Sequence, residues 1–421
     1  MSSDRLEQPS QSAPSGRSLV VLVACSAALA ALGIDALLPA LPQIGREMHV
    51  QVENHVQWLV SSYFLGLGLG QLIFGTLSDA LGRKPVLIGG VLAYAVFSAI
   101  SIFLPNFAGL LVARAVQGFF IAAASVVTRS IVRDLCRGAT MAKIMSTAFA
   151  VFLLVPILGP AFGQLFLLFV PWRALFVMMA ALGLLHAGWF GPRWPETLPK
   201  SARRRPDLLH LRAVIVVVFT EPYSLMCSLA SALLGGWMLA YVSMMPQLFQ
   251  HTFARPEWMA GALGICATAM AAGSLLSARL VERVGPMRIA VTALVGFVVF
   301  ALAHVGWIAA GHETLVSFIV LQAVTLAAMG LASSNLSACA MENMGHVAGT
   351  AASLQGVVTM AGSAVLSSLV GAGFSGGVGW VPLSAVLLGG VAASLVTVLR
   401  YRTRPTTQRS CVGCARDNGG A

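Results

Sequence analysis

Charged residues are scarce in this chain. Only 10% of its 421 residues are Asp, Glu, Lys or Arg, whereas 57% are hydrophobic. Soluble domains carry roughly 25% charged residues, so this composition excludes an ordinary soluble domain. We infer an all-α protein that crosses a membrane many times.

Motifs for several other functions are also missing. The sequence holds no G-x-x-x-x-G-K-[ST] motif, which argues against an ATP-driven pump. Its seven cysteines form no framework for extracellular disulfides, and Cys411-Val-Gly-Cys414 lacks the His or second Cys pair that a metal site needs. The apolar runs hold no cluster of catalytic side chains, so a membrane-embedded enzyme is a distant alternative. We expect no cofactor and no metal.

The hydrophobic residues are gathered in twelve runs, each long enough to span a membrane as a helix. These predicted spans cover residues 18–41, 56–78, 86–104, 108–132, 143–168, 172–193, 222–246, 257–278, 286–308, 313–339, 349–372 and 380–400.

The connections between the runs predict the domain organisation. Residues 1–17 are polar and predict a disordered tail. The longest connection, 194–221, separates a six-helix bundle at 18–193 from a second one at 222–400, and 401–421 forms a second tail. The Arg203–Arg205 run in this loop is typical of an anchor for anionic headgroups.

Basic residues are distributed unevenly between the two sides of the membrane. Of the 26 lysines and arginines, all but Arg46, Arg114, Arg173 and Arg255 fall in the tails or in alternate loops. Cytoplasmic loops are rich in Lys and Arg, so both termini and the central loop are predicted to be cytoplasmic. The net charge of +11 then reflects topology, and we expect no nucleic-acid partner.

A short charged loop separates the second and third runs. It reads Gly75-Thr-Leu-Ser-Asp79-Ala-Leu-Gly82-Arg83-Lys84, and its glycines permit a sharp reversal of the chain. Glu282 and Gly285 echo Asp79 and Gly82 at an offset of 203 residues (282 − 79 and 285 − 82), which suggests an internal repeat.

This loop resembles the signature between helices 2 and 3 of the major facilitator superfamily. The matches are Gly75, Leu77, Asp79, Gly82, Arg83 and Lys84, while Ala80 stands where the family often has Arg. The resemblance implies two six-helix bundles with the substrate site between them near mid-membrane. We expect Asp79 to meet the helix that starts near Gly349-Thr350 and Arg83 to reach Asp134. These residues would form a latch that holds the two halves together on the cytoplasmic side in the outward-open state.

Two charges are predicted to lie inside the bilayer, where charged groups are rare and usually functional. Asp35 lies in the first run and Arg114 in the fourth, both about 9 Å below the outer surface at 1.5 Å per residue. Burial favours the neutral acid and a nearby guanidinium favours the carboxylate. We expect Asp35 to carry a proton and Arg114 to tune it through a direct or water-bridged contact. A static ion pair is the alternative.

Two further segments resemble superfamily motifs. Leu110, Arg114, Gln117 and Gly118 match a helix-4 pattern whose Arg is linked to proton transfer. Val155-Pro156-Ile-Leu-Gly159-Pro160-Ala-Phe-Gly163-Gln164 resembles the helix-5 motif of exporters at Gly159, Pro160 and Gly163, and departs from it at Val155 and Gln164. Pro160 removes a backbone donor and predicts a kink, which could also be purely structural.

The first half most resembles the Bcr/CflA group of drug:proton antiporters. The resemblance rests on Ile34-Asp35-Ala-Leu-Leu-Pro39-Ala-Leu-Pro42, Ser62-Tyr63-Phe-Leu-Gly66, Arg133-Asp134-Leu135, Trp172-Arg173 and Glu196-Thr197-Leu198. It implies a monomer in the bacterial inner membrane that exports small lipophilic drugs in exchange for protons. An uptake symporter or uniporter of the same fold is the main alternative.

Substrate contacts are predicted among polar and aromatic residues within the runs, although a residue of this kind serves packing more often than ligand contact. The candidates are Tyr63, Gln71, Gln164, Trp237, Tyr241 and Asn335. The adaptable side chains of Met238, Met244 and Met245 are predicted to form a wall for varied apolar ligands.

Overall fold

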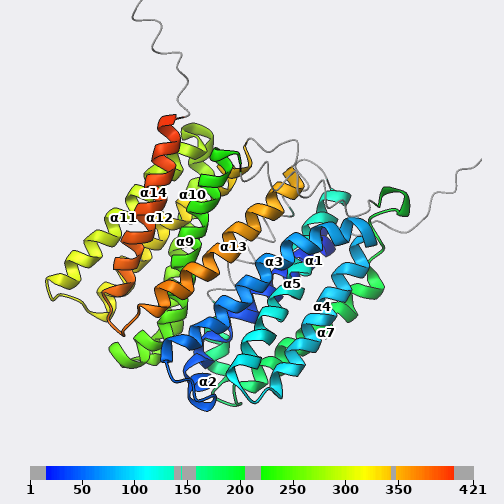
Figure 1. Cartoon of the computed structure of the whole chain (residues 1–421), viewed down its shortest axis with the longest axis horizontal. Helices are drawn as coiled ribbons and strands as arrows, with labels where there is room; N and C mark the ends of the chain where they lie inside the picture. The colour runs from blue at the N-terminus through cyan, green and yellow to red at the C-terminus, as the bar shows by residue number, and fades with distance from the viewer. Residues whose placement is uncertain (1–15, 137–143, 145–157, 204–219, 343–347, 403–421) are drawn as a thin grey trace, which may run out of the picture.

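The computed structural model describes residues 16–136, 144, 158–203, 220–342 and 348–402. These residues form two helical bundles with no strand among them (Figure 1). The first bundle contains α1 (Gly16–Asp35), η1 (Leu38–Ala40), α2 (Leu41–Glu47), η2 (Glu53–Gln57), α3 (Trp58–Leu81), α4 (Arg83–Ile102), α5 (Phe107–Leu135), a helical segment at 158–166 and α7 (Arg173–Arg193). After η3 (Lys200–Ala202), the second contains α9 (Pro222–Gln247), η4 (Leu248–Thr252), η5 (Pro256–Trp258), α10 (Met259–Val284), α11 (Pro286–Ala309), α12 (Leu315–Met341), α13 (Ala348–Ala372) and α14 (Trp380–Arg402).

The long helices have the length and composition of membrane spans. Eleven helices of the described residues qualify. Of the predicted span at 143–168, residues 143 and 145–157 lie outside the described residues. Large apolar side chains such as Val112, Leu185 and Leu369 are more than half exposed on the bundle surface. Such a surface is stable only against lipid, which agrees with the predicted all-helical membrane fold.

The ends of the bundles are named here by their landmarks. The Gly82 end carries the α3–α4 turn, and the α2 end carries α2 and η4 at the opposite extremity. The predicted tails lie almost wholly outside the described residues, as do Cys411, Cys414 and most of the central loop.

The two bundles repeat one another. Gly82 joins α3 to α4 with φ +109°, and Gly285 joins α10 to α11 with φ +85°. These left-handed conformations strain any residue with a Cβ. The close helix pairs repeat too, since Gly70 packs against α5 and Gly273, 203 residues later, packs against α12. The internal repeat inferred from Glu282 and Gly285 therefore has a structural counterpart.

The bundles meet mainly along α3 and α13, which run side by side at the centre of Figure 1. At the α2 end, polar contacts join the halves. Asn54 donates to the carbonyl of Phe374, Gln57 donates to Gln247 at 3.5 Å, and Gln164 donates to the carbonyl of Pro256 at 3.1 Å. We call this hydrogen-bonded boundary the α2-end seam.

Candidate functional site

A cavity of about 250 Å³ lies between the two halves and is the candidate binding site. Both bundles contribute to its wall, which is largely apolar. Its lining includes Ile34, Asp35, Phe64, Pro160, Met238, Tyr241, Cys266, Leu326, Met329, Thr359, Met360 and Ser363. Of the described residues that line it, Asp35 alone is charged. A site of this kind suits a lipophilic molecule and one ionisable contact.

Asp35 occupies a break in the first membrane-spanning segment. The helix α1 ends at Asp35, and the chain continues through a turn and η1 into α2. Pro39 and Pro42 follow at the first turns of η1 and α2, where their missing N–H groups are tolerated. The predicted span at 18–41 lies within the candidate span Arg17–Glu47, but its α-helix is interrupted after Asp35. The break leaves the Asp35 side chain at the wall of the central cavity.

The predicted exporter segment packs directly on this break. A Cβ added to Gly159 would come within 2.6 Å of the Cβ of Asp35, and one on Gly163 would collide with the backbone of Ala36. Only glycine allows the 158–166 segment to approach so closely. Pro160, between them, lines the central cavity beside Asp35. The sequence pattern gave no indication that Gly159 contacts Asp35.

Arg114 lies elsewhere and forms no ion pair with Asp35. Its side chain is fully buried and donates to the carbonyl of Gly33 at 2.7 Å, to Gln117 at 2.9 Å and to the carbonyl of Leu59 at 3.4 Å. The guanidinium also lies 4.3 Å from the ring centroid of Tyr63. The direct contact and the static ion pair are therefore not formed in this structure, whereas the water-bridged contact stays a prediction. Backbone carbonyls satisfy the cation, while the break in α1 turns Asp35 to the cavity.

Of the six predicted substrate contacts, only Tyr241 lines the central cavity. Tyr63 donates to the carbonyl of Ala30 at 2.9 Å, and Trp237 donates to that of Val381 at 3.2 Å. Asn335 bonds to Ser277 at 2.6 Å between α12 and α10. These three side chains therefore hold helices together.

The two glutamines lie at boundaries between the halves. Gln71 is buried on α3 facing Gly356 of α13, and Gln164 lies on the α2-end seam. Neither lines the central cavity, and their predicted role as substrate contacts stays a prediction.

The residues that sequence reasoning missed are mostly apolar. Phe64, next to the predicted Tyr63, lines the cavity together with Met329 and Met360. Met238 lines it as predicted, whereas Met244 and Met245 pack in the core of the second bundle. An apolar side chain in an apolar span carries no signal in the sequence, because only helix rotation distinguishes cavity from core.

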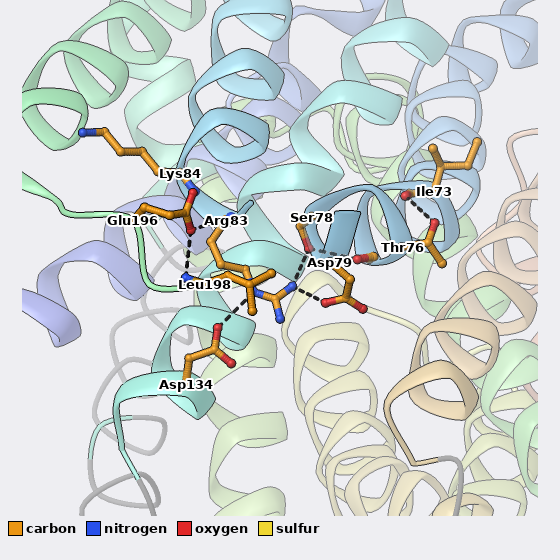
Figure 2. A network of polar contacts seen from close by, with 10 residues as sticks. Ile73, Thr76, Ser78, Asp79, Arg83, Lys84, Asp134, Glu196 and Leu198 are labelled. Carbon is orange, nitrogen blue, oxygen red and sulfur yellow. Dashed lines mark hydrogen bonds and ion pairs between the residues drawn. The ribbon is translucent and has the colours of Figure 1, made fainter. Parts of the chain in front are cut away.

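A polar network surrounds the predicted latch at the Gly82 end (Figure 2). The buried guanidinium of Arg83 contacts Asp79 at 2.5 Å, Asp134 at 3.0 Å and the hydroxyl of Ser78 at 2.8 Å. Arg83 thereby links α3, α4 and α5. The side chains around Gly349 and Thr350, predicted to meet Asp79, lie outside the described residues.

Glu196 completes this network and was not predicted to act in it. Its carboxylate accepts from the backbone N–H of Arg83 at 2.9 Å and of Lys84 at 3.3 Å (Figure 2). It also lies 3.8 Å from Arg203 of the central loop. A carboxylate at a helix N-terminus binds unsatisfied donors and complements the helix dipole. The sequence signal that could have pointed to Glu196 was its place in the Glu196-Thr197-Leu198 segment, which contributes to the resemblance to the Bcr/CflA group.

Comparison with known proteins identifies the family. The profile described as Major Facilitator Superfamily matches residues 23–367, most of the chain. The chain belongs to the major facilitator superfamily. It is therefore a multi-pass membrane transporter rather than an enzyme.

The transporter is similar in sequence to several bacterial proteins. It is 30% identical to an uncharacterized MFS-type transporter, YdgK, of Bacillus subtilis, covering 85% of this chain and 90% of the relative. It is 30% identical to a bicyclomycin resistance protein homolog of Haemophilus influenzae, covering 80% and 85% respectively. A chloramphenicol resistance protein of Pseudomonas aeruginosa is 37% identical over 40% of each chain.

Solved structures support the fold of the transporter. A D-xylose-proton symporter superposes with a TM-score of 0.72 at 13% identity, covering 90% of this chain and 97% of the symporter. The human organic anion transporter MFSD10 gives a TM-score of 0.62 at 20% identity, covering 92% of this chain and all of MFSD10. At these identities the likeness concerns the fold alone.

Proposed function

We propose that this transporter exports small lipophilic compounds in exchange for protons. The observation that carries the proposal is Asp35, the one charged group among the described lining residues of the central cavity. A carboxylate in an apolar cavity binds a proton in place of the hydration it has lost. A lipophilic substrate that fills the cavity competes for the same space, which gives a simple basis for exchange.

Two further observations favour drug export over uptake. The relatives named for bicyclomycin and chloramphenicol resistance share 30% and 37% identity with this chain over the aligned regions. The segment that resembles the exporter motif packs on Asp35 through Gly159. We therefore assign the cavity to antibiotic-like molecules. Uptake of a substrate by the same fold remains the alternative to be tested by the direction of transport.

The break at Asp35 offers a route from protonation to gating. Beyond the break, α2 packs against α9 of the opposite half. Because α1 and α2 are joined only through a turn and η1, a change at Asp35 can alter how α2 covers the α2 end. Arg114 acts on this break through the carbonyl of Gly33, two residues before Asp35. The break thus connects the proposed proton site with α2 at the α2 end.

We propose that the Gly82 end faces the cytoplasm and that both termini lie there. The concentration of basic residues in the tails and central loop supports this orientation. In this arrangement Asp79, Arg83 and Asp134 join α3, α4 and α5 on the cytoplasmic side of the first bundle. The cytoplasmic latch between the two halves, in which Asp79 meets the start of α13, remains part of the proposal. The protein is expected to act as a monomer in the inner membrane.

A susceptibility panel in an efflux-deficient bacterium tests export. Cells producing the transporter should tolerate higher concentrations of at least one lipophilic antibiotic, and a protonophore should remove the difference. Higher accumulation of the drug in producing cells would instead indicate uptake, and would contradict the proposal.

Proton release tests the role of Asp35. Addition of an identified drug substrate to the detergent-solubilised protein in weak buffer should release protons. Asp35→Asn should abolish this release and active efflux while retaining drug binding, because the amide resembles the protonated acid. Glu257→Gln, which alters an exposed carboxylate at the α2 end, is the matched control. Equal proton release by Asp35→Asn and the parent would assign the carrier elsewhere.

A further inference from the structure

An apolar groove lies between α1 and α7 on the surface of the first bundle. Its volume is about 300 Å³, and the side chains that line it include Val21, Cys25, Leu32, Leu182, Leu185 and Trp189. Leu185 and Trp189 are 67% and 60% exposed, so the groove opens toward the lipid-facing surface. It shares no lining residue with the central cavity. We call it the α1–α7 groove.

A hydrogen bond holds α1 against α7 beneath the groove. The Oγ of Ser26 and the Nε2 of His186 lie 2.9 Å apart, and both residues are buried. The His186 ring also packs against Phe190, with 4.8 Å between the ring centroids. These contacts fix the spacing of the two helices, so the groove is a built feature of the bundle.

The groove has the length of one membrane leaflet. Its lining residues on α1 extend from Val21 to Leu32, which is about 16 Å at 1.5 Å per residue. The hydrocarbon core of a bilayer is about 30 Å thick, so each leaflet contributes about 15 Å. Leu32 lies at the middle of the candidate span Arg17–Glu47. One acyl chain of a lipid therefore fits along the groove.

The groove begins where α1 starts and α7 ends. Helix α1 continues toward α2, and Arg173 at the start of α7 pairs with Glu47 of α2 at 2.7 Å. The two helices therefore run antiparallel, and the start of α1 and the end of α7 lie together at the Gly82 end. Arg17 is in the first turn of α1, and Arg193 is the last residue of α7. Each helix thus brings one arginine to the level of the lipid headgroups.

Both arginines share a helix face with residues that line the groove. Arg17 precedes Val21 by four residues, which places the two on one face of α1. Arg193 follows Trp189 by four residues, and its guanidinium lies 5.4 Å from the centroid of the Trp189 ring. Both arginines are exposed. Positive charge therefore flanks the groove at the Gly82 end.

The electrostatics at this end favour an anionic headgroup. No acidic residue is found among the described residues that line the groove. Glu196, the first acidic residue after α7, accepts from backbone N–H groups at the start of α4 and lies 3.8 Å from Arg203. Basic residues at a membrane surface attract anionic lipids, and a guanidinium binds phosphate oxygens through charge-assisted hydrogen bonds.

We propose that the α1–α7 groove binds an anionic phospholipid, with one acyl chain along the groove and the phosphate between Arg17 and Arg193. The lipid belongs to the leaflet at the Gly82 end. Trp189 lies where the acyl chain meets the headgroup, the level at which tryptophan is enriched in membrane proteins. The site is separate from the central cavity, so the proposal does not depend on the proposed export function.

Photochemical crosslinking to the purified full-length protein in lipid nanodiscs tests the site. The probe is a phosphatidylglycerol with a diazirine in one acyl chain, diluted into phosphatidylcholine. Phosphatidylcholine with the same diazirine chain is the matched control. The anionic probe should crosslink to residues 21–32 and 182–190, about tenfold more than the control probe. Equal crosslinking by the two probes, or crosslinks spread evenly over the bundle surface, would overturn the proposal.

Charge variants separate a specific site from a general attraction to basic surfaces. Arg17→Gln and Arg193→Gln should each lower crosslinking in the groove about fivefold, whereas Arg193→Lys, which keeps the charge, should retain most of it. Arg283→Gln removes an exposed arginine at the end of α10, in the other bundle, and should leave crosslinking within about twofold. Similar losses in Arg193→Gln and Arg283→Gln would overturn the specific site.

A steric variant tests the path of the acyl chain. Ala28 lines the groove, so the larger side chain in Ala28→Phe should occupy its space and remove the groove crosslinks while both arginines remain. Elution of the variant as a monodisperse peak shows that it is folded. Unchanged crosslinking in folded Ala28→Phe would overturn the placement of the chain. The charge variants decide the proposal by themselves if this variant does not fold.

Discussion

Glu196 joins the central loop to the start of α4 through one carboxylate. Its contacts with the backbone N–H groups of Arg83 and Lys84 are those of a helix N-cap supplied from more than a hundred residues away. Gly82, the N-cap residue by position, has no side chain to do this. Stability at the Gly82 end therefore depends on a residue in the central loop.

Substitution of Glu196 should destabilise this end. Glu196→Gln retains one oxygen acceptor but loses the charge, and we expect the free energy of unfolding to fall by about 1 kcal/mol. Thermal unfolding in detergent measures the change. Glu257→Gln, also a paired carboxylate but at the other end, should change it much less. Equal effects of the two substitutions would argue against capping by Glu196.

The substitution Asp79→Asn tests the proposed cytoplasmic latch. Asp79→Asn weakens the contact with the buried Arg83 guanidinium while its side chain, about half exposed, leaves packing intact. We expect impaired transport with normal insertion in the membrane. Glu282→Gln is the control, because Glu282 is the repeat counterpart of Asp79 and is exposed. Wild-type efflux in Asp79→Asn at normal expression would remove the latch from the mechanism.

The close packing of α3 against α5 depends on glycine residues, which have no side chain. Gly118 of α5 lies against α3 so closely that a Cβ would collide with the carbonyl of Tyr63 and lie 3.0 Å from the nitrogen of Leu67. Two rigid backbones cannot move apart there without opening the contact on both sides. The pair also carries Arg114, whose partners come from α1, α3 and α5.

Gly118→Ala should therefore destabilise the first bundle. Overpacking of this kind costs about 1–3 kcal/mol, and it should lower the yield of monodisperse protein and its unfolding temperature. Gly89→Ala makes the same chemical change where nothing lies within 4 Å of the added methyl group. It should be neutral or slightly stabilising, since Ala favours helix. Similar losses in both variants would contradict the steric argument.

The helices could be predicted from the sequence because the length of an apolar run alone specifies a membrane span. The turn at Gly82 could be predicted because its residues are distinctive. The residues that line the central cavity could not be predicted. Tyr63 and Phe64 are adjacent, yet only Phe64 lines the cavity, and hydropathy carries no information about helix rotation. The break at Asp35 escaped prediction because the residues after it, Ala36–Leu38, are as apolar as those before it.

At the scale of the whole molecule, the halves meet along α3 and α13 and at the α2-end seam. Among the described residues, three side-chain hydrogen bonds cross this seam. Opening the α2 end therefore breaks few polar interactions between these residues. This is consistent with a transporter whose two end states differ little in free energy.

The proposed exchange predicts the charge moved in each cycle, because Asp35 is the one carboxylate among the described lining residues of the central cavity. One proton exchanged for a neutral drug moves net charge, worth about 2.3 kcal/mol per 100 mV. A membrane potential without a pH gradient should therefore drive neutral substrates in vesicles. A monovalent cation exchanges for one proton without net charge and should not respond. Equal drive on both would contradict a single proton site.

The two glycine turns differ in their surroundings. Around Gly82, an added methyl group would meet Glu196 and Arg203, whereas no described residue lies within 4 Å of a methyl group added at Gly285. One of the two repeated turns therefore lies in a crowded network, and the other does not. Substitution at position 82 is limited by the backbone conformation and by the neighbouring side chains, whereas at position 285 the backbone conformation alone limits it. The turn of the second bundle should therefore tolerate a wider range of side chains.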